Sequence, residues 1–229
     1  MAQVMATRWQ DIRQGHALWQ PAPPKPAPDS PFRALVGPAW NRLPVAVQAR
    51  FARHIPANAC VSYAGEVVHC RISRAGWWLA QIARLIGAPL PLSTDTGVAA
   101  SVSVTGDADG RSQHWTRQYG RHGRPPQVIH SAKCFAGPTG IEEYLGCGIG
   151  IALTLRGEDD ALFFDSDHMF VRAGPFRMRL PSWLNPGQMT VGHIDMGGGR
   201  FAFTLDLRHR WLGELFHQVA LFSDTAVAR

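Results

Sequence analysis

The sequence predicts a mostly β protein (α+β), in which a strongly curved or barrel-like antiparallel sheet carries one or two packed helices. Long segments alternate apolar and polar residues with a period of two, which is typical of strands. Turn signals such as Asp-Ala-Asp-Gly and Gly-Gly-Gly separate these segments at hairpin distance, which favours a meander over βαβ units. A sheet of about nine strands does not stay flat and open, so we expect it to curl.

Length and composition indicate one globular domain with a tail. The chain has 229 residues, of which 45% are hydrophobic and 17% charged, so it is long enough for one sizeable core. The formal net charge is +6, but residues 1–55 hold seven basic and two acidic residues, and the remainder is close to neutral. Nucleic-acid binding is therefore not expected of the domain.

The chain divides into three parts. Residues 1–31 form a basic tail that ends in a proline-rich linker, which is extended and semi-rigid. We expect the folded domain over residues 32–224 and a short C-terminal tail over residues 225–229. The N-terminal segment lacks the apolar stretch of a secretory signal, so we expect a soluble, cytoplasmic protein.

Two helices are predicted. Pro44 opens the first, over Val45–His54, and Pro56 ends it. The second spans Gly76–Gly87 and is too short and too polar to cross a bilayer. We expect its apolar stripe to pack on the sheet, not to lie in a membrane interface. The stripe consists of Trp78, Ile82, Leu85 and Ile86.

The strands follow one another with short turns between them. They are expected over Val61–Ile72, Val98–Thr105, Ser112–Tyr119, Gln127–Phe135, Gly140–Arg156, Ala161–Arg172, Phe176–Leu180, Gln188–Met196, Arg200–Arg210 and Gly213–Phe222.

The predicted strand Gly140–Arg156 carries an acidic residue in an apolar row. Every second residue from Ile141 to Leu155 is apolar except Glu143, and three alternate glycines on the other face let the sheet bend. A desolvated carboxylate has a raised pKa unless it meets a base. Glu143 is therefore a candidate general acid/base or ligand-orienting group. The alternatives are a position at the wet rim of the strand or an ion pair with an interior arginine.

Two histidines also fall on apolar faces. His209 continues the alternation of residues 201–207, and His217 alternates with Leu215 and Val219. On adjoining strands the two would approach each other, and together with Glu143 they are candidate catalytic residues. The alternative for each histidine is a hydrogen-bonded core residue.

Two further groups are candidate ligand contacts. Trp115, Arg117 and Tyr119 share one face of a strand, and an arginine flanked by aromatic rings suits a carboxylate, a phosphate or a planar ligand. The alternative is an outer face on which the arginine covers the tryptophan. His193 and Asp195 share a face and form a weaker candidate pair.

The sequence favours neither a metal nor a cofactor. Asp165, Asp167 and His168 resemble a metal-binding trio in composition, but one strand does not direct all three to a single ion without a bulge. The four cysteines lack C-x-x-C spacing and are expected to be free core thiols. No G-x-S-x-G, H-E-x-x-H or P-loop motif occurs, so hydrolase, zincin and nucleotidase functions lack support.

Several separated motifs occur in a recognisable order. They are F-R-A-L-V-G-P-A-W-N-R-L-P (32–44), W-T-R (115–117), I-E-E-Y-L-G (141–146), L-P-S-W-L-N-P (180–186) and G-G-G-R-F-A-F-T-L-D-L-R-H-R-W-L-G-E-L (197–215). Over Phe32–Asp224 the chain resembles the DUF4166 family, a bacterial family without an assigned function. Members of this family also occur fused to dehydrogenase-like domains, which implies a dehydrogenase-type partner enzyme by association.

Three hypotheses for the function follow. The first is a binding module that encloses an apolar or lipid-like small molecule in the concavity of the sheet. The second is a cofactor-independent cyclase, isomerase or lyase that uses Glu143 with His209 or His217 as acid and base. The third is an interaction protein that docks a partner or nucleic acid through its basic, proline-linked tail.

Overall fold

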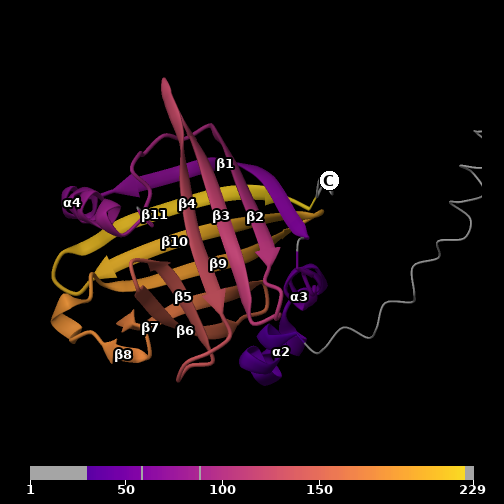
Figure 1. Ribbon diagram of the computed structural model, residues 1–229. Coiled ribbons are helices and arrows are strands. Elements are labelled where there is room, and N and C mark those ends of the chain that lie inside the picture. Colours follow the sequence, from indigo (N-terminus) through magenta and orange to yellow (C-terminus); the bar gives the residue numbers. More distant parts are fainter. Residues whose placement is uncertain (1–29, 58, 88, 225–229) are drawn as a thin grey trace, which may run out of the picture.

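The strands form a closed antiparallel β-barrel. The computed structural model describes residues 30–57, 59–87 and 89–224, and in these ranges ten strands close a ring while an eleventh pairs outside it (Figure 1). The predicted fold class is thereby confirmed. Most of the predicted N-terminal tail and linker, and all of the C-terminal tail, lie outside the described residues, so the predicted domain boundaries stay predictions.

The strand order is a meander that returns to its start. The strands are β1 (Cys60–Ile72), β2 (Val98–Gly106), β3 (Ser112–Arg121), β4 (Arg124–Cys134), β5 (Ile141–Gly146), β6 (Ile149–Gly157), β7 (Ala161–Ala173), β8 (Phe176–Arg179), β9 (Gln188–Gly197), β10 (Arg200–His209) and β11 (Gly213–Ser223). Their order is β6-β5-β4-β3-β2-β1-β11-β10-β9-β7, and the pairing of β6 with β7 closes the ring. The far edge of β7 pairs with β9 over Ala161–Asp165 and with β8, outside the ring, over Phe170–Ala173.

Helical segments close one end of the barrel. These are α2 (Pro31–Val36), η1 (Gly37–Arg42) and α3 (Val45–Ala52), at the right in Figure 1. Phe32 and Phe51 are buried, and the Phe32 ring meets Phe51 and Phe135 edge-on, with ring centres 5.2 and 5.0 Å apart. Helix α3 begins at the predicted residue and ends two residues earlier than predicted.

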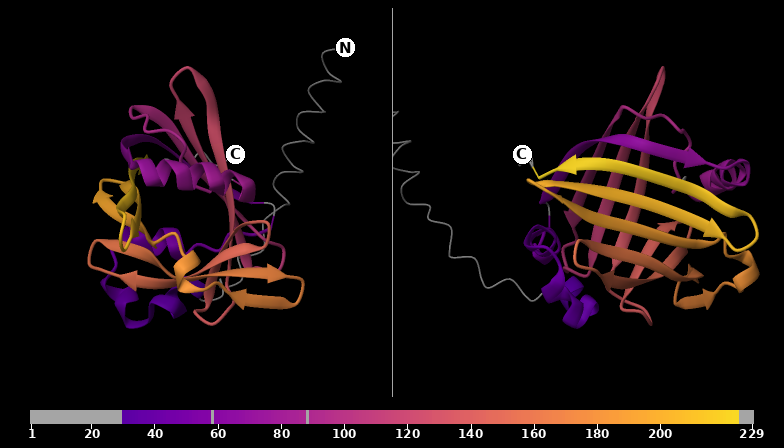
Figure 2. Two further views of the ribbon diagram at one scale, coloured as in Figure 1. Left: turned by 90° about the vertical axis from the view of Figure 1, so that its left-hand side faces the viewer. Right: turned by 180° about the vertical axis from the view of Figure 1, so that it is seen from behind.

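The opposite end of the barrel stays open between two helical segments. In the end-on view of Figure 2 (left), α4 (Arg74–Ala83) lies along the upper side of the opening and continues into η2 (Arg84–Ile86). The short η3 (Ser182–Leu184) lies below the opening. Among the described residues, no helix is both long enough and apolar enough to cross a membrane.

Helix α4 packs through its smallest residues, and the predicted packing face is wrong. Trp78 is 64% exposed, and Ile82 and Leu85 are exposed as well. The buried residues of α4 are Gly76, Ala80 and Ala83. A Cβ atom at Gly76 would lie 2.1 Å from the backbone oxygen of Leu215 on β11, so the two backbones are too close for a large side chain between them.

The predicted long strand Gly140–Arg156 is a hairpin of two strands, so the ten predicted strand segments correspond to eleven strands. β5 and β6 are joined by Cys147 and Gly148, whose φ angles of 50° and 74° are both positive, as a two-residue type I′ turn requires. A two-residue turn alone would exchange the faces of odd- and even-numbered residues between the two strands, but a β-bulge at Leu145 restores the alternation, so that Glu143 pairs with Ile151. The apolar row is therefore on the inner face of both strands, as predicted, and Glu143 lies in it.

Two glycine substitutions separate backbone strain from steric conflict. Gly148→Ala and Gly174→Ala both place alanine at positive φ, but only at Gly148 does the new Cβ meet a backbone atom, the Arg172 oxygen at 2.3 Å. We expect Gly174→Ala to lower the free energy of unfolding by about 1 kcal/mol and Gly148→Ala to lower it by clearly more. Urea unfolding checks both values, and equal losses would contradict the tight β5–β6 turn.

Candidate ligand-binding site in the barrel interior

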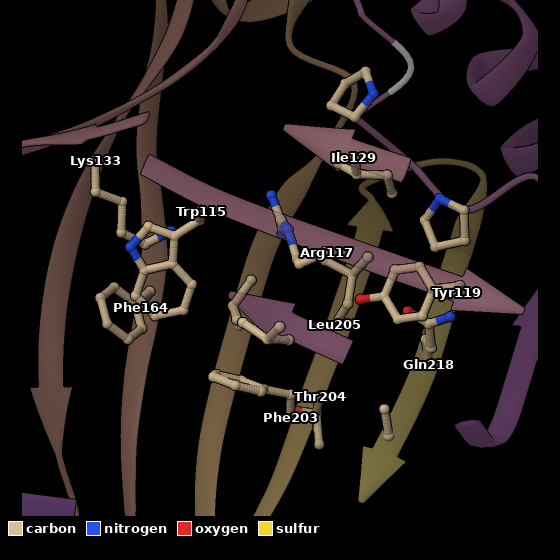
Figure 3. Close-up of a pocket in the computed structure, with 15 residues that line it drawn as sticks. Trp115, Arg117, Tyr119, Ile129, Lys133, Phe164, Phe203, Thr204, Leu205 and Gln218 are labelled. Carbon is tan, nitrogen blue, oxygen red and sulfur yellow. The ribbon is translucent and has the colours of Figure 1, made fainter. Parts of the chain in front are cut away.

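Two adjoining cavities lie inside the barrel among the described residues. The inner cavity is small, with a volume of about 40 Å³, and it is lined by side chains from β2, β3, β4 and β7 to β11, with β8 excepted (Figure 3). The mouth cavity has a volume of about 320 Å³ and lies between α4, η2 and η3. The two cavities share the lining residues Pro89, Arg117, Val191 and Leu205, so they adjoin at these side chains.

The predicted aromatic and arginine group on β3 faces this space. Figure 3 shows Trp115, Arg117 and Tyr119 along one face of the strand, toward Phe203 and Leu205. Trp115 is buried, and burial raises the pKa of the Tyr119 hydroxyl. Of the two predicted alternatives, the interior position is the one that the structure has.

Glu143 lies between two cations and is 3% exposed. Lys133 Nζ donates a hydrogen bond to Glu143 Oε2 at 2.8 Å, and Arg117 Nη2 donates one to Glu143 Oε1 at 3.2 Å. Arg117 Nη2 also donates to Ser131 Oγ at 2.9 Å. We call Arg117, Lys133 and Glu143 the central charged group; it comes from the three consecutive strands β3, β4 and β5.

Lys133 belongs to the central charged group but was not predicted as a site residue. Lys133 is directly opposite Glu143 in the β4–β5 pairing. It is buried, as are Gln127, Ile129 and Ser131, which point to the same face of β4. Its ammonium group also lies 4.7 Å from the centre of the Trp115 ring. The signal was present in the sequence, because a lysine in an inward row is as unusual as a glutamate.

The ionisation of the central charged group follows from burial and from its neighbours. Burial raises the pKa of Glu143, but the charges of Lys133 and Arg117 outweigh burial and hold that pKa at about 2. Burial lowers the pKa of Lys133, against the opposing effect of Glu143. Glu143 is therefore an ionised counter-ion at neutral pH and not a proton donor.

The central charged group has a spare donor and excess positive charge. Within the described residues, Arg117 Nε is buried and has no hydrogen-bond partner. Among the residues that line the two cavities, Arg117 and Lys133 are cations and Glu143 is the one carboxylate. An anionic group would satisfy both the free N–H and the charge balance.

The histidines predicted near Glu143 lie elsewhere. His209 is at the β10–β11 turn, where its Nδ1 accepts hydrogen bonds from the backbone N–H groups of Trp211 and Leu212, both at 3.3 Å. His217 is on the outer face of β11, where its Nδ1 is 2.7 Å from Asp206 Oδ1. The predicted inward face for His217 is wrong, because residues 216, 218, 220 and 222, which alternate with it, are buried, while His217 is only partly buried.

His193 and Asp195 are held at the closed end of the barrel. Arg50 on α3 places Nη1 3.1 Å from His193 Nε2 and 3.4 Å from Asp195 Oδ1, and its Nη2 is 2.6 Å from Asp224 Oδ2. Burial and then the Arg50 charge lower the pKa of His193 well below its usual value. The predicted pair therefore fastens α3 to β9 and lies apart from the central charged group.

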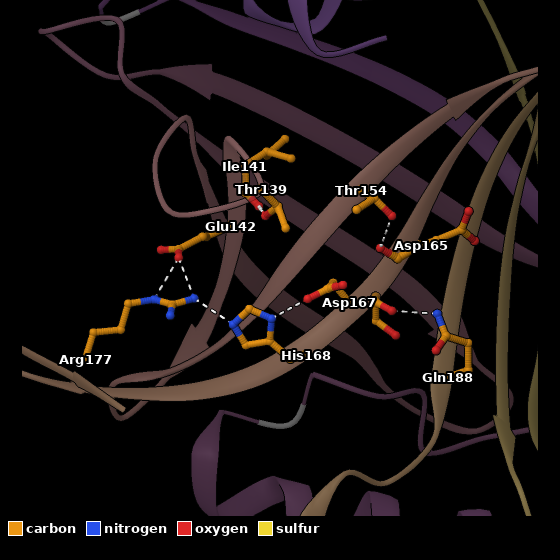
Figure 4. Close-up of polar contacts among 10 residues, drawn as sticks. Thr139, Ile141, Glu142, Thr154, Asp165, Asp167, His168, Arg177 and Gln188 are labelled. Atoms are coloured by element: carbon orange, nitrogen blue, oxygen red, sulfur yellow. Dashed lines mark hydrogen bonds and ion pairs between the residues drawn. The ribbon is translucent and has the colours of Figure 1, made fainter. Parts of the chain in front are cut away.

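A separate polar network lies on the outer face of the barrel (Figure 4). The buried carboxylate of Glu142 accepts a hydrogen bond from Arg177 Nε at 2.9 Å, and Arg177 Nη2 is 3.0 Å from His168 Nε2. His168 contacts Asp167 through its other ring nitrogen. These contacts connect β8 to β5 across β6 and β7, which is a structural role.

The fold and the interior together define a class of protein, a closed β-barrel with a lined cavity that opens at one end. This architecture is compatible with ligand binding. The particular family follows from the sequence match: the chain belongs to DUF4166, a family described as a domain of unknown function, whose model matches residues 43–222. A search of the curated proteins found no match to this chain.

Removal of the Glu143 charge tests whether the central charged group stabilises the fold. Glu143→Gln leaves Lys133 buried without its counter-ion, so we expect the free energy of unfolding to fall by about 3 kcal/mol. The exposed Glu158→Gln, which removes a surface ion pair with Arg156, should cost less than about 1 kcal/mol. Urea unfolding of the two variants measures the contrast, and equal effects would contradict it.

The effect of Glu143→Gln should depend on pH in a defined direction. The Glu143 carboxyl has a pKa of about 2 in the folded chain against an ordinary value of 4.5, so it stabilises the fold above pH 4.5. The difference between wild type and Glu143→Gln should therefore shrink as the pH falls from 4.5 toward 2. A difference that is independent of pH in this window would show that the charge of Glu143 is not what stabilises the fold.

Proposed function

We propose that the barrel binds an apolar, lipid-like small molecule that carries one acidic group. The acidic group contacts Arg117 and Lys133, and the apolar part extends toward the mouth between α4 and η3. The observation that carries the proposal is the central charged group, which has an unpartnered Arg117 N–H and surplus positive charge inside an apolar cavity.

The lining of the mouth cavity supports an apolar ligand. Its walls are mainly aliphatic, and the residues nearest the central charged group include Leu145, Ile151 and Met169. Ligand sites of this kind combine a predominantly apolar wall with a few polar groups that fix the orientation of the ligand. An acidic head group in the centre and an apolar chain toward the mouth match that division.

The alternative hypotheses receive less support. Acid–base catalysis by Glu143 with His209 or His217 lacks the necessary contact, because Glu143 is paired with cations and both histidines are elsewhere. Docking through the basic tail concerns residues outside the described ranges. A cytoplasmic location and a dehydrogenase-type partner enzyme stay predictions.

Binding of a fluorescent fatty acid tests the proposed ligand chemistry. We expect the wild-type chain to bind cis-parinaric acid more tightly than its methyl ester, which has no charge. Arg117→Met should weaken binding of the acid about 10- to 100-fold, the loss of one charge-assisted hydrogen bond, and should leave ester binding nearly unchanged. Fluorescence titration of both probes measures this split.

Two further variants locate the site and guard against misfolding. Leu205→Trp places a large ring where the two cavities meet, so it should abolish binding of both probes. Arg121→Met removes an arginine on the same strand that donates to the Pro125 backbone oxygen and lines neither cavity, so it should leave both titrations unchanged. Unchanged binding in Leu205→Trp, with a normal urea unfolding curve, would place the ligand outside the barrel and overturn the proposal.

A further inference from the structure

Exposed apolar side chains gather around the open end of the barrel. We define the apolar rim as Trp78 and Ile82 on α4, Leu85 in η2, Trp183 in η3, and Trp211 and Leu212 in the β10–β11 turn. Trp183 and Trp211 are 74% and 71% exposed, respectively. Isolated exposed apolar residues are ordinary on protein surfaces, but a group of this kind at one end of a molecule marks an interaction site.

The segments that carry the rim lie around part of the entrance to the mouth cavity. Figure 1 shows α4, the β10–β11 turn and the η3–β8 region one below another at the left edge of the barrel, and Figure 2 (left) shows the same segments around the opening. Ile82 lines the mouth cavity itself, as does Leu184, the neighbour of Trp183. The apolar surface of the rim is therefore continuous with the apolar wall of the cavity.

The segments that carry the rim are basic. Residues 74–86, 176–184 and 208–212 contain six arginines and no acidic residue. Arg74, Arg84 and Arg210 are exposed, and the Arg210 guanidinium lies 4.1 Å from the centre of the Trp211 ring. Arg177 and Arg208 are neutralised in part by Glu142 and Glu214. The remaining positive charge surrounds the apolar side chains.

We propose that the apolar rim docks the barrel mouth-first on the surface of a lipid bilayer that contains anionic lipids. Tryptophan prefers the membrane–water interface, where its ring is in apolar surroundings and its N–H in polar ones. Arginines beside it meet the phosphate groups of anionic lipids, and each basic residue near such a surface strengthens binding. A protein partner would need a surface that is complementary to the rim. A fluid bilayer has no fixed surface, so it can receive side chains from separate segments around the cavity entrance.

The docked orientation places the cavity entrance against the bilayer. An apolar molecule then passes between the bilayer and the mouth cavity without exposure to water, which would otherwise oppose its transfer. The docking itself rests on the rim and its arginines and not on the proposed ligand. It is therefore testable on the full chain in the absence of any added small molecule.

Vesicle co-sedimentation tests the docking. We expect the full chain to bind vesicles of phosphatidylcholine with phosphatidylglycerol and to bind vesicles of phosphatidylcholine alone more weakly. Trp78→Ser/Trp183→Ser/Trp211→Ser should weaken binding to both vesicles at least about tenfold, because it removes the inserted rings. Arg84→Gln/Arg210→Gln should weaken binding to the anionic vesicles on the order of tenfold, and this effect should diminish at high salt.

Matched substitutions at the closed end provide the controls. Val45→Ser removes an apolar side chain that is 82% exposed on α3, and Arg42→Gln/Arg111→Gln removes two exposed arginines from η1 and the β2–β3 turn. Neither control should change vesicle binding. Unaltered binding in the rim variants would overturn the proposal, and so would an absence of vesicle binding by the wild type. A dimer that the triple tryptophan variant dissociates, seen by light scattering without vesicle binding, would assign the rim to a second copy of the chain instead.

Discussion

A carboxylate that is removed from water needs positive charge close by, and the interior of this barrel meets that requirement at Glu143. Lys133 and Arg117 supply the charge from the two preceding strands, so the ion contacts hold β3, β4 and β5 in one register. The same contacts fix Arg117 at the point where the inner and mouth cavities meet. The need to neutralise the Glu143 carboxylate thus fixes both the pairing of β3, β4 and β5 and the position of the charged groups in the cavity.

The two ends of the barrel have different chemistry. At the closed end, helices α2 and α3 fill the barrel with aromatic rings, and Arg50 bridges α3 to Asp195 and Asp224. At the open end, the fully buried residues of α4 are small, Leu79 is partly buried against them, and Trp78 and Ile82 are exposed. The central charged group is reached from the open end, through the mouth cavity. This asymmetry gives the cavity one direction of access.

Alternation along the chain was sufficient to predict the fold class and the inward face of β5, β6 and β10, and it showed that Trp115, Arg117 and Tyr119 share one face of β3 without deciding which face is inside. It worked for Glu143 because a β-bulge at Leu145 offsets the change of parity that the two-residue turn introduces, so the odd-numbered residues share one face across the β5–β6 hairpin. It failed for His217 because both faces of β11 carry apolar residues: Phe216, Ala220 and Phe222 are buried, whereas Val219 and Leu221 share the more exposed face of His217. Which face is inside then depends on what covers the strand, and single-strand patterns do not contain that information.

Contacts between segments that are distant in the chain could also not be predicted from the sequence. Helix α4 packs on β11 at Gly76 and Leu215, with the opposite face from the one expected. Helical spacing indicates an apolar stripe, but it does not show whether the helix packs through that stripe or through its glycine and alanines. Lys133 is a different case, because its position depends on no distant contact. Its alternation with Ile129 and Ser131 was visible in the sequence.

Closure of the ring also determines which strand edges are available to pair with a strand of another chain. A closed barrel has no free strand edges, and of the eleven described strands only β8 pairs on one side alone. Strand β8 has only four residues, which include Arg177 and Arg179. A short edge strand with charged side chains opposes the addition of a strand from another chain. The outer edge of β8, where another strand could add to the sheet, therefore carries positive charge.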